Sequence, residues 1–150
     1  MTRLGKLVCF FSAPYERQIF LLRDIPIDVG AVNFYPSLEY NSLSVIAYGI
    51  DSEFGQADSE SIAEFLARTG LPANVSLSAL EELCCLINLL RCSPYASSYW
   101  TRRALKQKTE WALVRRMAQL ALNQLNWQFE CNSEDMLELL EYFGTRGNCA

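Results

Sequence analysis

Residues 80–94 read LEELCCLINLLRCSP, a leucine-rich run that carries three cysteines and ends at a proline. Ser78, followed by Glu81 three residues later, is typical of a helix start, and Pro94 cannot continue a helix. Apolar residues occupy nearly every side of this helix: Leu80, Leu83, Leu86, Ile87, Leu89 and Leu90. The pattern predicts a helix buried in the middle of the domain.

The cysteines of this helix raise the question of a metal or redox site. At about 100° per residue Cys84 and Cys85 point in different directions, and Cys85 and Cys92 lie on one side but about 10 Å apart along the axis. A disulfide needs Cα atoms within about 7 Å, and zinc needs thiolates at about 2.3 Å. We therefore predict that Cys84 and Cys85 are buried, reduced core residues with no metal or cofactor. A site completed by Cys9 or Cys131 stays open.

The rhythm of the apolar residues changes along the chain, and this change predicts the fold. Short β-branched and aromatic runs, which predict three or four antiparallel strands, occupy residues 7–11, 18–22, 31–35 and 42–50. Helical spacing and capping residues predict about four helices, at residues 61–70, 78–93, 97–127 and 132–144, the third with a break around residues 107–109. The expected fold is α+β, a single domain of residues 1–150 in which a strand-rich part (1–50) packs against a helix-rich part (58–150).

The composition argues against most enzyme classes. The 150 residues include no histidine, which removes the commonest general base and metal ligand. Neither a P-loop nor a G-x-G-x-x-G motif is present. We interpret the chain as non-enzymatic, and a small enzyme that uses carboxylate or thiol chemistry remains the third alternative.

The same composition predicts a cytoplasmic protein. The apolar stretch at residues 7–11 is shorter than the roughly 7–15 residues of a signal-peptide core, and no window approaches about 18 apolar residues, so we expect no membrane span. Six cysteines at irregular spacing are then best interpreted as reduced thiols. The net charge of −4 disfavours bulk binding to phosphate backbones.

A basic segment offers the clearest functional signal. Residues 97–119 read SSYWTRRALKQKTEWALVRRMAQ and hold six of the thirteen Lys and Arg residues. On a helical wheel one apolar arc, suited to docking on a core, contains Trp111, Val114, Met117, Ala118, Ala121, Leu122 and Leu125. Arginine and aromatic residues on the remaining side match the composition of interface hot spots. The predicted partner-binding residues are Tyr99, Trp100, Arg102, Arg103, Lys106, Leu113, Arg116 and Leu120.

These observations favour a protein that binds another protein, as an inhibitor, an adaptor, an immunity-type protein or a small subunit of an assembly. The first alternative is a nucleic-acid-associated accessory protein that uses the same basic helix. Residues 62–90 have the outline of a helix-turn-helix, but Glu81 and Glu82 stand where a recognition helix needs groups that reach bases and phosphates. The remaining alternative is that the basic helix binds no partner and is a solvated face, with its basic side chains paired internally to Glu110 or to acidic helices.

Overall fold

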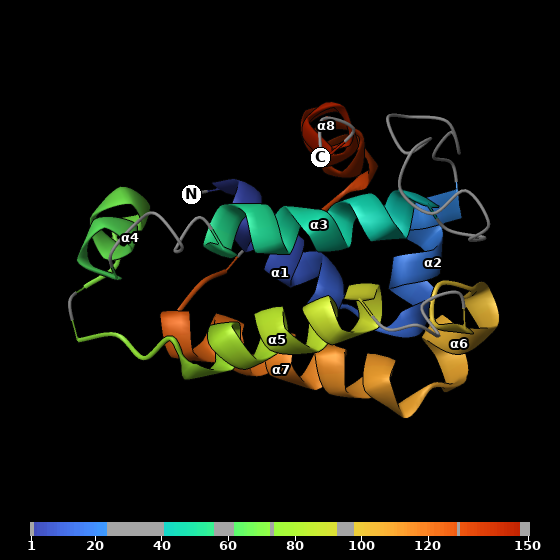
Figure 1. The fold of residues 1–150 in the computed structure, drawn as a ribbon, viewed down its shortest axis with the longest axis horizontal. Coiled ribbons are helices and arrows are strands. Elements are labelled where there is room, and N and C mark those ends of the chain that lie inside the picture. Colours follow the sequence, from blue (N-terminus) through green and yellow to red (C-terminus); the bar gives the residue numbers. More distant parts are fainter. Residues whose placement is uncertain are drawn as a thin grey trace.

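The computed structural model describes residues 2–23, 41–55, 62–72, 74–92, 98–128 and 130–147. Within these ranges the chain forms eight helices (Figure 1): α1 (Thr2–Ser12), α2 (Tyr15–Arg23), α3 (Asn41–Gly55), α4 (Ile62–Thr69), α5 (Ser78–Cys92), α6 (Arg102–Gln107), α7 (Thr109–Leu125) and α8 (Ser133–Gly147).

The predicted α+β fold is wrong. Of the described residues 82% are helical and none lies in a strand, so there is no sheet in this part of the chain. Residues 7–11 belong to α1, residues 18–22 to α2 and residues 42–50 to α3. The remaining strand prediction, at residues 31–35, lies outside the described residues.

The error has a physical cause. Short apolar runs fit a buried strand and a buried helix equally well, and only their spacing and length separate the two. In α1 the buried positions include Leu4, Leu7, Val8 and Phe11, which follow the helical i, i+3, i+4, i+7 pattern. In α3 the same pattern is formed by Leu43, Ile46, Ala47 and Ile50. Both stretches are therefore amphipathic helices whose apolar side is unusually wide.

The predicted helices of the second half are confirmed in place, but the third begins at Arg102, about one turn later than predicted, and residues 98–101 lie outside any α-helix. Gly70, with φ of +72°, ends α4 as expected. The predicted break around residues 107–109 falls at Lys108, whose extended backbone separates α6 from α7. The last helix, α8, continues three residues past its predicted end at Gly144.

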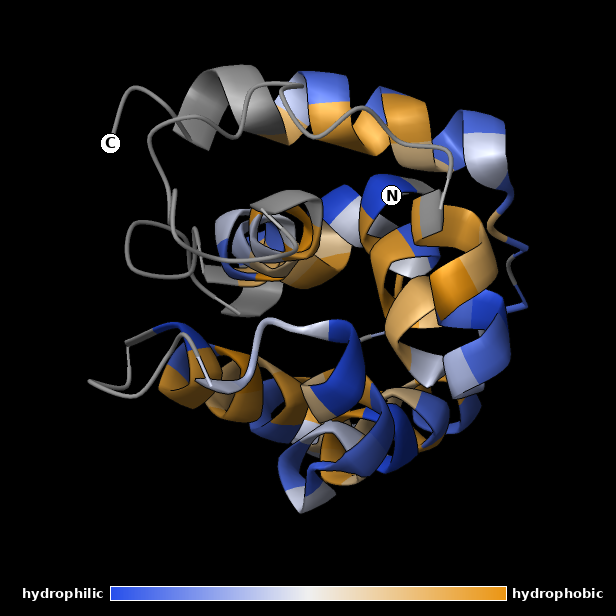
Figure 2. Cartoon of the chain, turned by 90° about the vertical axis from the view of Figure 1, so that its right-hand side faces the viewer, coloured by the Kyte–Doolittle hydropathy of each residue, from blue (hydrophilic) through white to orange (hydrophobic). Residues whose placement is uncertain are grey.

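The helices form layers. In Figure 1, α1 and α3 lie between α8 on one side and the pair α5 and α7 on the other, with α2 and α6 at one end and α4 at the other. Hydrophobic and hydrophilic segments alternate along each helix in Figure 2, as expected for helices that bury one side. The buried core accordingly draws on every layer, from Phe143 of α8 to Val114 of α7.

A buried glutamine joins four of these helices. Gln18 of α2 is fully buried, and its amide nitrogen donates to the carbonyl oxygens of Phe10 (3.1 Å) and Phe11 (3.4 Å) at the end of α1. Its amide oxygen accepts a hydrogen bond of 2.9 Å from Nε of Arg115 on α7. Arg115 also donates to the carbonyl oxygen of Leu105 on α6. These bonds satisfy the buried carbonyl of Phe11 and add a second hydrogen bond to the carbonyl of Phe10, which also accepts from the backbone nitrogen of Ala13.

A glycine sets the separation of α3 and α8. A Cβ atom at Gly49 would lie 2.8 Å from a ring carbon of Phe143. That ring is fully buried and is held edge-on by Tyr48 and Tyr142, with ring centroids 6.4 Å and 4.9 Å away. The ring has no free space to move into, so α8 can approach α3 this closely only because residue 49 lacks a side chain.

Gly49→Ala should therefore lower the free energy of unfolding, by about 1–2 kcal/mol. The clash in a packed core outweighs the gain of roughly 1 kcal/mol that alanine brings to a helix interior. Urea unfolding followed by circular dichroism measures the change. In a double-mutant cycle with Phe143→Leu the two losses should be less than additive, because the smaller side chain relieves the clash. A stabilised Gly49→Ala variant would show that the two helices are not tightly packed here.

Candidate partner-binding surface

Helix α7 uses three of its sides for packing and leaves one outside. The arc predicted to dock on the core does so: Trp111, Val114, Ala118, Ala121 and Leu125 are buried, and Met117 and Leu122 pack against them. On the opposite side Leu113, Leu120 and Arg116 are exposed, with 41% and 40% of the two leucines accessible. The predicted division of this helix into a core side and an outer side is confirmed.

The hydrogen bonds of Gln124 show that α5 lies beside the outer side of α7. Its side-chain oxygen accepts a hydrogen bond of 3.1 Å from the backbone nitrogen of Ala79, and its amide nitrogen donates to Oγ of Ser78 at 3.2 Å. The C-terminal end of α7 thus caps the N-terminal end of α5. At the other end the indole of Trp100 donates to the carbonyl oxygen of Leu90 and stacks edge-on against Trp111. The two helices therefore run antiparallel, side by side.

Exposed and half-buried apolar residues of both helices line the outer side of their junction. At about 100° per residue, Leu113, Met117 and Leu120 all lie within about 40° of Gln124, on the α5 side of α7. Leu86 and Leu89 lie within about 20° of Ala79 and Ser78 respectively, on the α7 side of α5. We call these five residues the apolar strip: Leu86, Leu89, Leu113, Met117 and Leu120.

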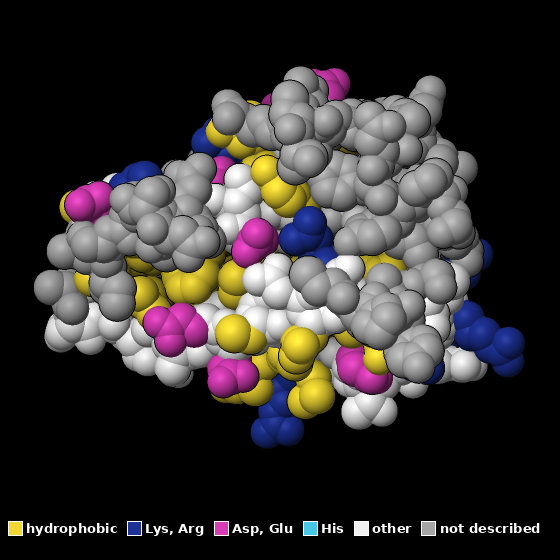
Figure 3. Space-filling view, viewed as in Figure 1, with side chains coloured by type: hydrophobic (Ala, Val, Ile, Leu, Met, Phe, Trp, Pro, Cys, Tyr) yellow, Lys and Arg dark blue, Asp and Glu magenta, His cyan; other side chains and the backbone are white. Residues whose placement is uncertain are grey.

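Three residues of the apolar strip, Leu89, Leu113 and Leu120, are exposed to solvent, whereas Leu86 and Met117 are half-buried. Leu89 is 67% exposed, the largest value among the exposed large hydrophobic residues of the described chain. Figure 3 shows hydrophobic side chains gathered at the lower edge of this face, over α5 and α7, with acidic side chains beside them and a Lys or Arg side chain projecting below. Grouped apolar side chains on a rigid pair of helices are typical of interaction sites, whereas single exposed leucines are common anywhere.

Charged residues of opposite sign lie along the strip. Glu81 and Glu82 are exposed on α5, and Arg116 is exposed on α7. None of the three side chains has a hydrogen-bond or ion-pair partner among the residues that the structure describes. At about 100° per residue Glu82 falls between Leu89 and Leu86, so it lies within the strip at its Ser78 end, whereas Glu81 lies at the α5 edge and Arg116 at the α7 edge.

The structure does not bring all the predicted partner-binding residues together. Arg102, Arg103 and Lys106 are exposed, but they lie on α6, a separate helix that packs against α2 and α7. The Lys106 ammonium lies 5.8 Å from the ring centroid of Tyr15, on α2. The break at Lys108 therefore divides the single basic face expected from the helical wheel into two groups on different helices.

The two predicted aromatic residues are held inside the protein. Trp100 has no exposed surface, so its prediction as a partner-contacting residue is wrong. Tyr99 is half-buried. Its hydroxyl donates a hydrogen bond of 3.2 Å to the Glu110 carboxylate, and its backbone carbonyl oxygen accepts one of 2.7 Å from the indole nitrogen of Trp111. The Lys108 ammonium lies 5.8 Å from its ring centroid. Tyr99 is thus part of the joint between α6 and α7, at one end of the strip.

Two residues of this surface escaped the sequence prediction. Leu89 and Cys85 were expected in a helix buried on every side, yet both are exposed. The signal was present: Glu82, Cys85 and Leu89 follow an i, i+3, i+7 spacing, so a charged residue marks the outer side of α5. The buried side carries Leu80, Leu83 and Ile87, as predicted.

The adjacent cysteines have opposite environments. Cys84 is buried, with 8% of its surface exposed, and its thiol lies 4.0 Å from a carboxylate oxygen of Asp51 on α3. Burial, reinforced by the charge of Asp51, raises the pKa of Cys84 to about 12, so the thiol stays protonated. The prediction of a buried thiol is confirmed for Cys84 and wrong for Cys85.

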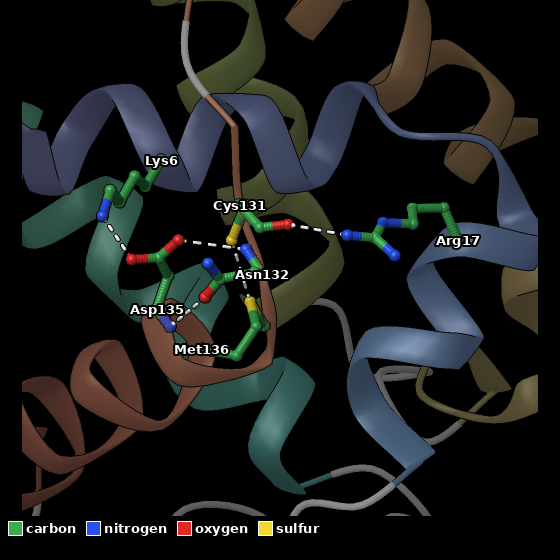
Figure 4. Close-up of polar contacts among 6 residues, drawn as sticks. All are labelled: Lys6, Arg17, Cys131, Asn132, Asp135 and Met136. Carbon is green, nitrogen blue, oxygen red and sulfur yellow. Dashed lines mark hydrogen bonds and ion pairs between the residues drawn. The ribbon is translucent and has the colours of Figure 1, made fainter.

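A second group of polar contacts lies where the α7–α8 connection crosses α1 and α2 (Figure 4). Asn132 and Asp135 form a reciprocal cap at the start of α8: each side chain accepts a hydrogen bond from the other's backbone nitrogen, at 2.9 Å and 3.0 Å. Lys6 of α1 pairs with Asp135, and Arg17 of α2 donates to the carbonyl oxygen of Cys131 at 3.2 Å. These contacts attach α8 to the first two helices.

A pocket of about 370 Å³ beside this group is lined by Cys9, Arg17, Leu21, Glu130, Cys131 and Asn132. Burial raises the pKa of the Cys9 thiol, and burial together with the charge of Asp135 raises that of Cys131 to about 12. Cys9 and Cys131 therefore do approach each other, but far from the reactive thiolate state. Through the hydrogen bond from Arg17 to the carbonyl oxygen of Cys131, the lining of this pocket joins α2 to the α7–α8 connection.

The cysteines should differ in reactivity. Among the four cysteines whose side chains the structure describes, we expect Cys85 to be alkylated first on brief exposure of the native protein to N-ethylmaleimide, since it is exposed, and Cys84 and Cys131 to react only after denaturation. Peptide mapping by mass spectrometry measures each site separately. Modification of Cys84 as fast as Cys85 would contradict the buried position of Cys84, and Cys85→Ser provides the control for off-site labelling.

The cap at the start of α8 should make the free energy of unfolding depend on pH in the acid range. Burial acts to raise the pKa of Asp135, but hydrogen bonds from Lys6 and from the Asn132 backbone outweigh it, so the pKa lies below its ordinary value. The stability from the ionised carboxylate is therefore complete above about pH 4 and is lost as the pH falls through the lower folded-state pKa.

Accordingly, Asp135→Ala should lower the free energy of unfolding at pH 7 by more than at pH 2.5. Urea titrations at the two pH values test this. Asp135→Asn separates the two contributions, because its amide oxygen can still cap Asn132 while the charge that attracts Lys6 is gone. An equal loss at both pH values would show that ionisation of Asp135 contributes nothing.

The comparisons with known proteins found no match, so a function is proposed from the residues of this chain alone. No family model matches the sequence, and neither a curated protein nor a solved structure matches it. Among the described residues there is no group of three or more cysteine and acidic residues placed to hold a metal ion, and no helix is both long and apolar enough to cross a membrane.

Proposed function

We propose that this protein is a non-enzymatic protein-binding protein, an inhibitor, adaptor or assembly subunit, that contacts its partner through the apolar strip on α5 and α7. The carrying observation is the strip itself: three leucines between 40% and 67% exposed, grouped on the outer side of two antiparallel helices. Burying such residues against a partner removes apolar surface from water, which is the main source of association free energy.

The rigidity of the surface supports this role. The inner sides of α5 and α7 are fixed by Leu83 and Ile87 on one helix and by Trp111 and Val114 on the other, all fully buried. The side chain of Gln124 on α7 accepts a hydrogen bond from one end of α5, and the carbonyl oxygen of Leu90 at the other end of α5 accepts one from the indole of Trp100, which precedes α6. A partner therefore meets a preformed surface, and little conformational entropy is lost on binding.

The charged groups around the strip are expected to set selectivity and association rate. Arg116 remains in the proposed site, and the basic residues of α6, Arg102, Arg103 and Lys106, extend it at one end of the helix pair. Exposed charges contribute more to steering than to affinity. We place this activity in the cytoplasm; no disulfide joins the cysteines whose side chains the structure describes, which suits a reducing compartment.

Substitution of the strip tests the proposal. Proteins captured from native lysate by the immobilised wild-type chain should be lost, by at least about tenfold, with Leu89→Glu/Leu113→Glu. The fold should persist, because both side chains are exposed and neither supports the core. Quantitative mass spectrometry of the captured proteins and thermal unfolding by circular dichroism measure the two effects.

Leu137→Glu is the matched control, because Leu137 is an equally exposed leucine (38%) on α8, across the molecule from the strip. It should retain the captured proteins. If the strip variant also retains them, the proposed surface is wrong. If Arg102→Glu/Arg103→Glu/Lys106→Glu removes them instead, binding belongs to α6. Capture of nucleic acid whose affinity falls steeply with salt would favour the nucleic-acid alternative.

A further inference from the structure

We infer that the partner presents a single amphipathic helix to the apolar strip, with acidic residues on the flank that lies over α7 and basic residues on the flank that lies over α5. This inference rests on the proposed function and specifies the partner's chemistry. It follows from the shape of the strip, from the polar groups at its ends and from the charges on its edges.

The shape of the strip suits one helix. Two antiparallel helices form a shallow groove along their junction, and a third helix that lies in it repeats the packing of a three-helix bundle. Leu113, Met117 and Leu120 span seven residues, or about 10 Å of α7. A partner helix with apolar residues at positions i, i+3, i+4 and i+7 covers the same distance.

Satisfied polar groups limit the strip at both ends. At one end Tyr99 bonds to Glu110 with Lys108 above the ring, and at the other Gln124 bonds to Ser78. These groups already have partners, so nothing is gained by covering them with apolar residues. The apolar contact of the partner should therefore be limited to about two helical turns.

The edges carry the strongest information about the occupant. Glu81 and Glu82 on α5 and Arg116 on α7 are exposed and lack partners among the described residues. A helix in the groove brings one of its flanks near each edge. The favourable arrangement places basic residues over the glutamates and acidic residues over Arg116, whereas any uniform flank charge meets repulsion on one side.

The same charges disfavour one arrangement of a second copy of this chain. Arg116 lies near the midpoint of α7 (Thr109–Leu125) and of the strip. A two-fold axis across the helices places Arg116 opposite Arg116 of the other copy, so like charges face one another in the centre of that interface. A two-fold axis along the helices places Arg116 over α5 of the other copy instead, and the oligomeric state of the wild-type chain distinguishes this arrangement from a partner helix. Phosphate backbones are disfavoured as well, because they would lie against Glu81 and Glu82.

Three synthetic helical peptides of about 16 residues test the inference. They share leucines at i, i+3, i+4 and i+7, and differ only in their flanks: Glu on one flank and Lys on the other, Glu on both, or Lys on both. Binding to the full chain is measured by fluorescence anisotropy. The mixed peptide should bind at least about fivefold more tightly than either uniform peptide, a difference of about 1 kcal/mol.

Reversing one edge should change the preferred peptide. With Arg116→Glu both edges are acidic, so the Lys-flanked peptide should bind best. With Glu81→Lys/Glu82→Lys both edges are basic, so the Glu-flanked peptide should bind best. Glu138→Lys makes a single charge reversal on α8, outside the proposed site, and the mixed peptide should remain preferred. Exposed charge reversals of this kind leave folding nearly unchanged, which thermal unfolding checks.

The helix-binding inference is overturned if no peptide binds at about 1 mM, if the order of preference is the same in every variant, or if the wild-type chain dimerises and Leu113→Glu makes it monomeric. In the first two cases the proposed function still stands if the Leu89→Glu/Leu113→Glu variant loses the proteins that the wild type captures. If it keeps them, the proposed function fails as well.

Discussion

The buried amide of Gln18 is the contact on which the arrangement of helices depends. Helix α1 buries an unusually wide apolar side, and the carbonyl oxygens of Phe10 and Phe11 at its end are buried with it. Gln18 donates to both of them and accepts from Arg115, whose guanidinium also binds α6. Removing the amide would take a hydrogen bond from each of the buried Phe10 and Phe11 carbonyls and one of two acceptors from the half-buried Arg115 guanidinium, which is costlier than losing an ordinary surface contact.

This network also orients α7, and so determines which of its sides meets solvent. Arg115 and Gln119 hold one edge of α7 to the first two helices, the latter through a bond of 3.1 Å to the carbonyl oxygen of Ser12. Gln124 holds the other edge to α5. Because both edges of α7 are fixed and its apolar arc lies in the core, Leu113, Arg116 and Leu120 are exposed to solvent. The proposed binding surface is thus a consequence of the packing.

Most charged groups on the other elements are used within the fold. The carboxylate of the buried Glu53 accepts a hydrogen bond of 2.6 Å from Arg3, and the backbone carbonyl oxygen of Glu53 accepts one of 2.9 Å from Arg68. The carboxylate of Asp51 accepts a hydrogen bond of 3.1 Å from the side-chain amide of Asn88. The acidic groups of α3 therefore join helices. The charges beside the apolar strip have no such use among the described residues, and this contrast favours a role for them toward a partner.

The sequence by itself determined the local features of the second half: the helices near residues 61–70, 78–93 and 132–144, the break at Lys108 and the core-facing arc of α7. Caps, glycine and a regular 3.6-residue period act over a few residues, so they can be found without knowing the neighbours. Only the tertiary structure decided that residues 2–12 and 41–55 are helices, because short apolar runs fit either element until their packing partners are known. It also decided that Trp100 lies inside while Leu89 and Cys85 lie outside, since exposure depends on which helix covers each side, and that information is held by residues far away in the chain.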